Sequence, residues 1–451
     1  MHNLVCKKEN IQVSSIAIIV AIISIIWIIQ PAFPIARAGY ITLAASIVCT
    51  AIAGCSNRKN FDISNLFKNP IFYFILTLGI MYTISSIIYS DRDRFVIGIS
   101  IGLIMPICSN ILDNCSAKKV FLHGFAIGNI ISFIFLFFAS LIFAPKIYIG
   151  QYYSIMLNPN GLSTAILPML ISSIYLIEKN RSKKAKIQTI FCLIAFSFIF
   201  SFLILSMSRT GLMGFLLTFL SYIIYLLINT RDKIYVLKMI LTILFFSYIA
   251  FLLSSLAVTD LSTNILDIRA SNSNKVYVFN KKNNGYIASK EVLKLIKNED
   301  GDSIAEDLEK RLSKGSRDGE DISSGRLAIW KASIEQLNLH GHNNDEKFYV
   351  PKRHINTNDT HNIYLQIGYF IGIPAMILMW IIMMINIFRI IKCFFRRKHE
   401  KYLNEEQLFR ASVITMFFVL SMLASVYIPI GSVIGMIFWM VSCWENKEKE
   451  I

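Results

Sequence analysis

The chain has 451 residues, of which 55% are hydrophobic, with a mean hydropathy of +0.55 and a formal net charge of +16. Soluble domains rarely reach this hydropathy, and apolar runs such as 11–29, 71–89 and 236–257 are as long as a membrane-spanning helix. Because these runs are continuously apolar rather than alternating, they exclude a transmembrane β-barrel. The sequence therefore predicts an all-α polytopic membrane protein.

Twelve apolar segments are predicted to cross the membrane, near 11–29, 39–55, 71–89, 95–112, 120–143, 161–177, 187–206, 210–229, 236–257, 361–391, 409–426 and 428–443. Lysine and arginine concentrate in alternate loops, and the other short loops hold few. By the positive-inside rule, both termini are cytoplasmic and the long loop between helices 9 and 10 lies outside. The basic excess is therefore a topology signal and not the mark of a nucleic-acid-binding protein.

The predicted topology divides the chain into helices 1–9, a large outer loop with short helices, and helices 10–12 with a cytoplasmic tail: 1–257, 258–360 and 361–451. The outer loop contains none of the eight cysteines. His340, His342 and His354 could form a metal site with His361, but the segment of His340 and His342 is rich in Gly and Asn and has no acidic residue at a ligand spacing. We therefore predict neither a disulfide framework nor a metal site.

Charged and polar turns lie on the outer side before the long loop. The turn 91–94 contains Arg92 and Arg94, which either pair with the acidic residues of the same turn or contact an anionic ligand. Further on, loop 144–160 ends in an Asn-Pro-Asn-Gly turn. Its Asn160 either lines a site on the outer face or only begins the sixth helix.

Arg209 lies in the tight outer turn Ser206–Gly211, between the seventh and eighth predicted helices. One interpretation is that its side chain extends to lipid headgroup phosphates. The other is that the turn holds a guanidinium at the membrane surface, where it forms paired hydrogen bonds with phosphate oxygens. The residues alone leave both interpretations open.

The large outer loop has two parts. Residues 262–321 carry mixed charges and are predicted to form a partly ordered insertion with short amphipathic helices at 289–297 and 302–312. The second part is a more regular helical pattern that follows the insertion.

This second pattern begins with Ser323 and Ser324, either of which can cap a helix. Arg326 then lies in the first turn, where free amides and the helix dipole favour an anion. An ordinary surface arginine is the alternative. The predicted apolar face of the helix consists of Leu327, Trp330, Ile334 and Leu337.

The outer loop ends in residues 358–362, where a polar segment passes into the tenth predicted helix. Side-chain oxygens of Asp359 or Thr360 can accept from free helix amides, so one of them is predicted to cap this helix. His361 then lies in the first turn, at the boundary between membrane and water. The glycines of this helix form a small-xxx-small pair that admits a second helix: Gly368 and Gly372.

Three motifs thus occur in order on the outer side. They are a Ser-Arg-Thr-Gly turn at Ser208–Gly211, a Gly-Arg-x-x-x-Trp helix at Gly325–Trp330, and a His-Asn followed by nine residues and Gly at His361–Gly372. Together with the topology, they resemble the bacterial O-antigen ligase superfamily, which includes O-antigen ligases, O-antigen and capsule polymerases, and protein O-oligosaccharyltransferases. The resemblance covers roughly 158–375 and departs from the family in the insertion 262–321.

The resemblance implies a GT-C-like, inverting glycosyltransferase that needs no metal or other cofactor. It would take a glycan from undecaprenyl diphosphate on the periplasmic face of the inner membrane. By the matching motifs, His361 is the base that removes the proton of the acceptor hydroxyl, a task suited to an imidazole with a pKa of about 6.5. Arg209 and Arg326 bind the diphosphate and offset its charge as it leaves. Further candidates to line the substrate, with core packing as the alternative for the aromatic pair, are Asn160, Asn362, Trp330 and Tyr364.

Within the superfamily, ligation of O-antigen to lipid A–core in lipopolysaccharide biosynthesis is the favoured function. A polymerase that joins repeat units on the same lipid carrier is the close alternative, and a protein-glycosylating member is a third. A glycolipid flippase or transporter would share the helices and the basic inner loops. Such a protein would not need the histidine and the two outer arginines. Ion-coupled transporters also usually keep buried acidic residues in the middle of their spans, and the predicted spans of this chain have none there.

Overall fold

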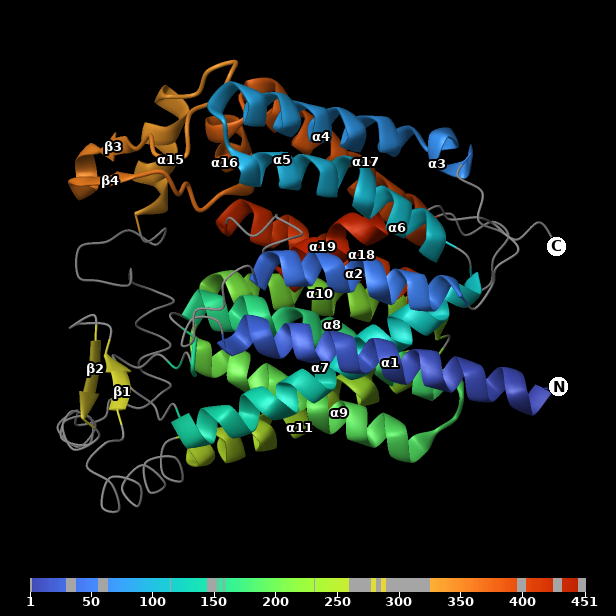
Figure 1. Ribbon diagram of the computed structural model, residues 1–451. Helices are drawn as coiled ribbons and strands as arrows, with labels where there is room; N and C mark the ends of the chain where they lie inside the picture. The colour runs from blue at the N-terminus through green and yellow to red at the C-terminus, as the bar shows by residue number, and fades with distance from the viewer. Residues whose placement is uncertain are drawn as a thin grey trace.

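The computed structural model confirms an all-α polytopic membrane protein (Figure 1). It describes residues 2–29, 38–55, 64–113, 115–143, 152, 154–156, 159–230, 232–258, 277–280, 285–288, 325–395, 403–424 and 432–444. Within these residues, ten helices are long and apolar enough to span a membrane. Two shorter apolar helices, Gly39–Gly54 and Val433–Ser442, lie at the second and twelfth predicted segments.

The candidate spans are α1 (His2–Ile29), α4 (Pro70–Tyr89), the continuous run of α5 (Arg92–Ile99), the π-helical turn η1 (Ser100–Ile104) and α6 (Met105–Leu112), then α7 (Cys115–Phe143), α8 (Pro159–Ser182), α9 (Lys186–Ser206), α10 (Arg209–Asn229), α11 (Lys233–Leu256), α17 (Ile373–Phe395) and α18 (Glu405–Leu423). The other helices are α2 (Ala38–Gly54), α3 (Ser64–Lys68), α15 (Arg326–Glu335), α16 (Ile363–Phe370) and α19 (Val433–Ser442). Two antiparallel strand pairs complete the described elements: β1 (Tyr277–Asn280) with β2 (Gly285–Ala288), and β3 (Phe348–Val350) with β4 (Ile355–Thr357).

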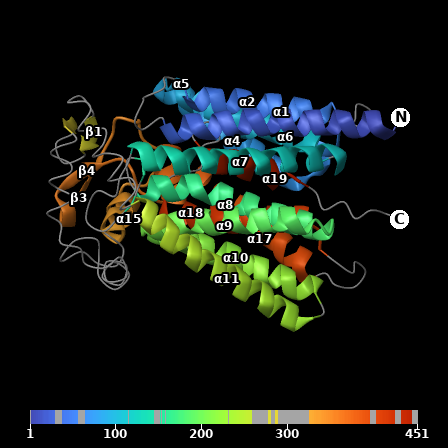
Figure 2. The same ribbon diagram turned by 90° about the horizontal axis from the view of Figure 1, so that it is seen from below.

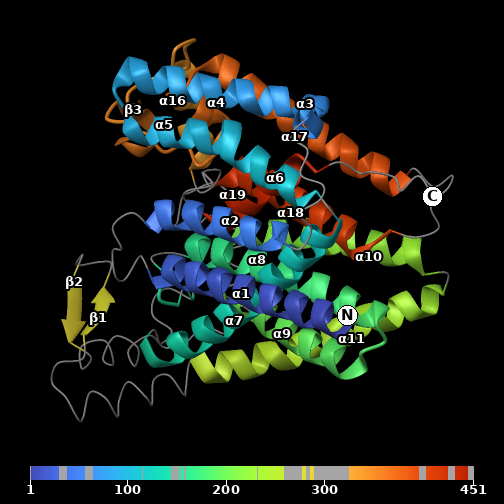
Figure 3. The same ribbon diagram turned by 45° about the vertical axis from the view of Figure 1, so that its right-hand side comes forward.

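Helix α8 lies at the centre of the bundle. It is the most buried candidate span, and it contacts α1, α7, α9, α10, α18 and α19. Figures 1 and 3 show α4, α5 and α17 on one flank, and α1, α7, α9 and α11 on the other, with α18 and α19 between them. The outer helices expose many large apolar side chains, for example Leu241 and Phe245 of α11 at 55% and 61%. Such surface is stable in contact with lipid and not with water.

A small second core lies at one end of the bundle, remote from the start of α1 (Figure 1). It joins α15, β3 and α16 through Ile329, Ala332, Phe348, Val350 and Tyr369. The predicted apolar face of α15 is wrong, because Leu327 and Ile334 are each 56% exposed. The helix turns its other face inward, since the β3–β4 hairpin packs there.

The tenth predicted helix is broken. Helix α16 ends at Phe370, and α17 begins at Ile373 after Gly372, whose φ is +115°. A Cβ atom on Gly372 would lie 2.3 Å from the carbonyl oxygen of Leu339. The predicted small-xxx-small contact with a second helix is therefore wrong, because this glycine admits the backbone of the chain that follows α15.

Arg94 connects the segment that follows α15 to the membrane helices. Its side chain, 2% exposed, donates to Ser85 Oγ at 2.7 Å, Phe370 O at 2.9 Å, His342 O at 2.5 Å and Asn344 Oδ1 at 2.9 Å, and it pairs with Asp91 at 3.1 Å. The predicted pairing of Arg94 with an acidic residue of its own turn is confirmed, but the arginine is buried and is not part of a surface turn. Arg94 joins α5, the chain after α15 and the end of α16 into one unit.

We expect Arg94→Gln to destabilise the protein by about 3 kcal/mol, because it breaks a buried charged network and leaves several partners unsatisfied. The measurement is the thermal unfolding midpoint in lipid nanodiscs, together with protease cleavage within 338–344. Arg92→Gln is the matched control, since Arg92 is exposed in the same turn. Equal midpoints for the two variants would contradict the structural role of Arg94.

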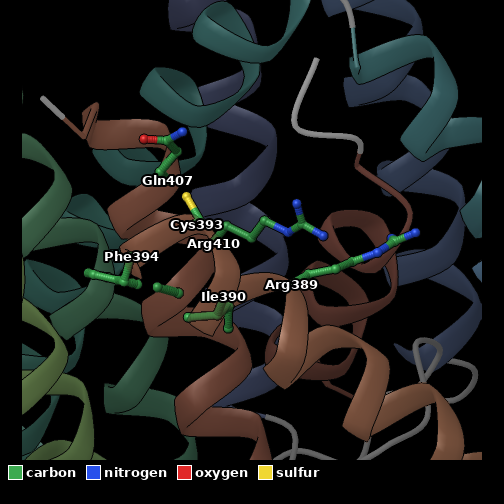
Figure 4. A pocket seen from close by; sticks show the side chains of 7 residues that line it. Arg389, Ile390, Cys393, Phe394, Gln407 and Arg410 are labelled. Carbon is green, nitrogen blue, oxygen red and sulfur yellow. The ribbon is translucent and has the colours of Figure 1, made fainter. Parts of the chain in front are cut away.

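Two arginines, Arg389 and Arg410, lie at the end of the bundle opposite the small second core (Figure 1). Arg389 of α17 and Arg410 of α18 line a pocket with Ile390, Cys393, Phe394, Gln407 and Ala411, and their side chains extend in the same direction (Figure 4). Arg389 donates to Ser442 O at 3.3 Å and to Asn69 Oδ1 at 2.7 Å. At 1.5 Å per residue, Arg389 is about 24 Å along α17 from its first residue. This pocket is therefore separate from the site described next.

Candidate active site

The first residues of α8, α10 and α15 meet at the end of the bundle that carries the small second core. Ser208 donates its hydroxyl to Asn160 Oδ1 at 2.8 Å and caps α10 by accepting from the amide of Gly211. Arg326 Nη1 donates to Thr210 Oγ1 at 3.3 Å. The two predicted phosphate-binding turns are thus brought together, and Asn160 lies beside the first of them.

Arg209 and Arg326 form a pair of cations at the starts of α10 and α15. Burial lowers the pKa of the Arg326 guanidinium, and the charge of Arg209 lowers this pKa further, whereas Asp359 raises it. A guanidinium keeps its charge at neutral pH. Two guanidiniums and two helix N-termini in one place create a strongly positive region that favours a bound anion.

His361 lies beside this positive region with its imidazole 46% exposed. Its φ is +51°, a left-handed conformation that is uncommon for residues other than glycine. The backbone amide of His361 donates to Asp359 Oδ1 at 2.8 Å, which holds this conformation. The prediction that His361 lies in the first turn of a helix is wrong: it precedes the cap of α16, on a fixed turn.

The segment 358–361 is held from two sides. From α16, Gln366 Nε2 donates to Asn358 O at 2.8 Å, and Gln366 Oε1 accepts from the amide of Thr360 at 2.8 Å. From α15, Trp330 Nε1 donates to Thr360 O at 3.0 Å. The side chain of Trp330 therefore connects the helix that carries Arg326 to the turn that carries His361.

Asp359 and His361 form a close pair. Nδ1 of the imidazole is 3.2 Å from Oδ2 of Asp359. Burial lowers the pKa of His361, Asp359 raises it, and the charges of Arg326 and Arg353 lower it again. Because an ionised carboxylate only accepts hydrogen bonds, Nδ1 carries the proton in the neutral ring, and Nε2 is left as the basic nitrogen.

We expect Asp359→Asn to shift the acidic limb of the pH–activity profile to lower pH. The Asp359 charge stabilises the imidazolium, so its removal lowers the pKa of His361 and keeps the ring neutral in more acidic solution. The plateau rate should also fall at least about tenfold, because the ring is no longer held in one tautomer. Asp345→Asn, at an exposed aspartate of the same loop, is the control. An unshifted limb would contradict the pairing.

Asn362 and Tyr364 are buried, and for Tyr364 this confirms the alternative of core packing. Asn362 is 7% exposed and caps α16, accepting from the amides of Tyr364 and Leu365 at 3.0 and 3.1 Å. The prediction that Asp359 or Thr360 caps this helix is therefore wrong. Tyr364 is 1% exposed, stacks on Trp380 at 4.0 Å and accepts from Ser421 Oγ at 3.0 Å. Both side chains are therefore part of the core.

Gln366 and Arg353 also belong to this site, although neither was predicted. No local sequence pattern distinguishes them, since their neighbours in space come from other elements. Among the described residues, no group of three or more histidine, cysteine, aspartate or glutamate side chains could hold a metal ion. The predicted caps Ser323 and Ser324 and the short helices at 289–297 and 302–312 lie outside the described residues.

Residues 191–380 match the model of the O-antigen ligase family. This part of the chain is similar to an O-antigen ligase domain. The resemblance to the O-antigen ligase superfamily is thus confirmed, and the matched range contains Arg209, Arg326 and His361. Neither the comparison with curated proteins nor the comparison with solved structures gives a match.

The similarity indicates an enzyme of the glycosyltransferase-like ligase or polymerase type. The matched residues lie in a multi-pass membrane protein and include most of α9, all of α10 and α11 and the start of α17 (373–380) as membrane helices, with α15 and α16 between α11 and α17. Figure 2 shows α15 and β3 at the end of the bundle, next to the ends of the long helices. The candidate site therefore lies where membrane helices end.

Proposed function

We propose that the protein transfers a glycan from undecaprenyl diphosphate to lipid A–core on the periplasmic face of the inner membrane. The observation that carries this proposal is the position of a half-exposed imidazole beside two clustered guanidiniums, within residues that match the O-antigen ligase family. A base and a diphosphate-binding pair are the two parts that such a transfer needs. Their place at the ends of membrane helices suits a donor whose lipid stays in the bilayer.

In the proposed reaction, Nε2 of His361 takes the proton of the acceptor hydroxyl as its oxygen attacks the anomeric carbon. Asp359 holds the ring and stabilises the imidazolium that forms. The bond between the anomeric carbon and the diphosphate breaks, and Arg209 and Arg326 offset the negative charge that develops on the leaving group. A single displacement from the face opposite the diphosphate inverts the sugar carbon.

Arginine charge can serve in place of a metal in this reaction. A guanidinium binds phosphate oxygens in pairs and is always protonated at neutral pH. We therefore propose that catalysis is metal-independent.

We also propose that both termini of the protein are cytoplasmic. The basic loops on one side of the predicted topology support this orientation.

The test uses the full chain in lipid nanodiscs with an undecaprenyl-diphosphate glycan, in buffer with EDTA and without an ion gradient. Product that forms on added lipid A–core, together with free undecaprenyl diphosphate, would support the ligase. Product that forms only on a second lipid-linked glycan would show the polymerase, which the family match equally allows. Donor that is consumed under neither condition would leave the flippase or transporter as the better interpretation.

A further inference from the structure

Arg353 is held on a rigid hairpin next to the candidate site. It ends the 3-10 turn η3 (Pro351–Arg353), which joins β3 to β4. Pro351 begins this turn with a fixed φ, and His354 closes it in the left-handed region at +49°. The base of the hairpin is anchored because Phe348 and Val350, 3% and 0% exposed, are part of the small second core.

The side chain of Arg353 lies against the start of α15. A Cβ atom on Gly325 would be 2.9 Å from Cδ of Arg353 and 3.1 Å from its Cζ. Gly325 has φ +77° and directly precedes Arg326, so glycine here both permits the backbone turn and makes room for the second arginine. The side chain of Arg353 therefore packs against the residue that directly precedes Arg326, at the start of α15.

Arg353 also acts on the imidazole. Its charge lowers the pKa of His361, as does that of Arg326, whereas Asp359 opposes both. Three arginines and one aspartate thus surround this side of the site, and they come from the start of α10, the start of α15, the η3 turn and the turn before α16. A group with two phosphoryl units matches such a set better than a group with one, because each guanidinium pairs with separate oxygens.

We propose that Arg353 is a third guanidinium that binds the diphosphate of the lipid-linked donor. This proposal rests on the proposed function and adds a binding residue to it. Arg209 and Arg326 approach the diphosphate from the starts of α10 and α15, and Arg353 approaches it from the hairpin that lies between α15 and His361 in the chain.

The experiment measures binding of farnesyl diphosphate and farnesyl monophosphate to the full chain in nanodiscs. Arg353→Gln should weaken diphosphate binding by about tenfold or more, which is the usual effect of losing a charge-assisted hydrogen bond. It should change monophosphate binding much less. Lys352→Gln is the matched control, since Lys352 is exposed in the same turn and carries the same charge. Thermal unfolding of each variant confirms that the hairpin is folded.

Two further results separate a failure of this inference from a failure of the proposed function. If Arg326→Gln weakens diphosphate binding while Arg353→Gln binds as well as Lys352→Gln, the role of Arg353 is overturned and the site stands. If Arg209→Gln, Arg326→Gln and Arg353→Gln all bind the diphosphate as the wild type does, the proposed diphosphate site is overturned.

A pH–activity profile gives an independent readout. Arg353→Gln should move the acidic limb of this profile to higher pH, because a cation that lowers the pKa of His361 is lost.

Discussion

Replacing His361 by alanine is expected to abolish glycan transfer, with a loss of at least about 100- to 10,000-fold in rate, because no other base is held at that position. Protein level and stability should change little, since the imidazole is 46% exposed and packs into no core. In the wild type, activity should fall as the solution becomes more acidic than the lowered pKa of His361 and the ring takes up a proton. The measurement is a lipopolysaccharide gel from cells whose only copy carries the substitution, with protein levels matched.

Two variants control for the backbone at this position. His361→Asn also removes the base, but asparagine tolerates the left-handed conformation well, so it should be as inactive as His361→Ala. His354→Ala should be active, because His354 is an exposed histidine with φ +49° in the neighbouring hairpin.

The gel also distinguishes the two enzyme types. Core without O-antigen, together with long chains on the lipid carrier, identifies the ligase. Core that carries single repeat units and no ladder identifies the polymerase. An unchanged ladder would remove His361 from the mechanism and with it the proposed function.

The second large effect is expected at the arginine pair. Arg326→Gln and Arg209→Gln should each lower the transfer rate by about 100- to 1,000-fold, because the charge that develops on the leaving diphosphate loses one of its partners. Arg326→Lys and Arg209→Lys should restore little of the rate, since an ammonium cannot form the paired hydrogen bonds of a guanidinium. The rate of release of undecaprenyl diphosphate in nanodiscs is the measurement.

Lys331→Gln provides the control for Arg326, because Lys331 is exposed on the same helix and its loss changes the net charge equally. It should transfer glycan at the wild-type rate. If the lysine variants were as active as the wild type, a general positive field would suffice. The guanidinium pair would then have no specific role.

The sequence predicted those features that depend on local patterns of residues, namely the membrane helices and the three short motifs. Apolar runs of membrane-spanning length predict helices because the bilayer leaves the backbone no other hydrogen-bond partners. Ten of the twelve predicted spans match long apolar helices among the described residues. The motifs at Arg209, Arg326 and His361 also selected the family that matches residues 191–380.

Tertiary structure decided what those motifs build. The cap of α16 is Asn362, and His361 lies before it in a strained turn, because Asp359, Gln366 and Trp330 hold the backbone there from outside the helix. Two partners of Arg94, the carbonyl groups of His342 and Phe370, lie 248 and 276 residues away in the sequence, and no local pattern predicts such contacts.

The sequence by itself thus determined the fold class, the family and the chemical types of the candidate residues, since these follow from hydropathy and short motifs. Only the tertiary structure showed that the tenth predicted helix breaks at Gly372, that α15 buries a different face from the predicted one, and that Arg353 packs against Gly325. The physical reason is the same in each case. The free energy of these arrangements comes from packing and hydrogen bonds between segments that are distant in the chain. The local sequence of one segment does not specify which distant segment will pack against it.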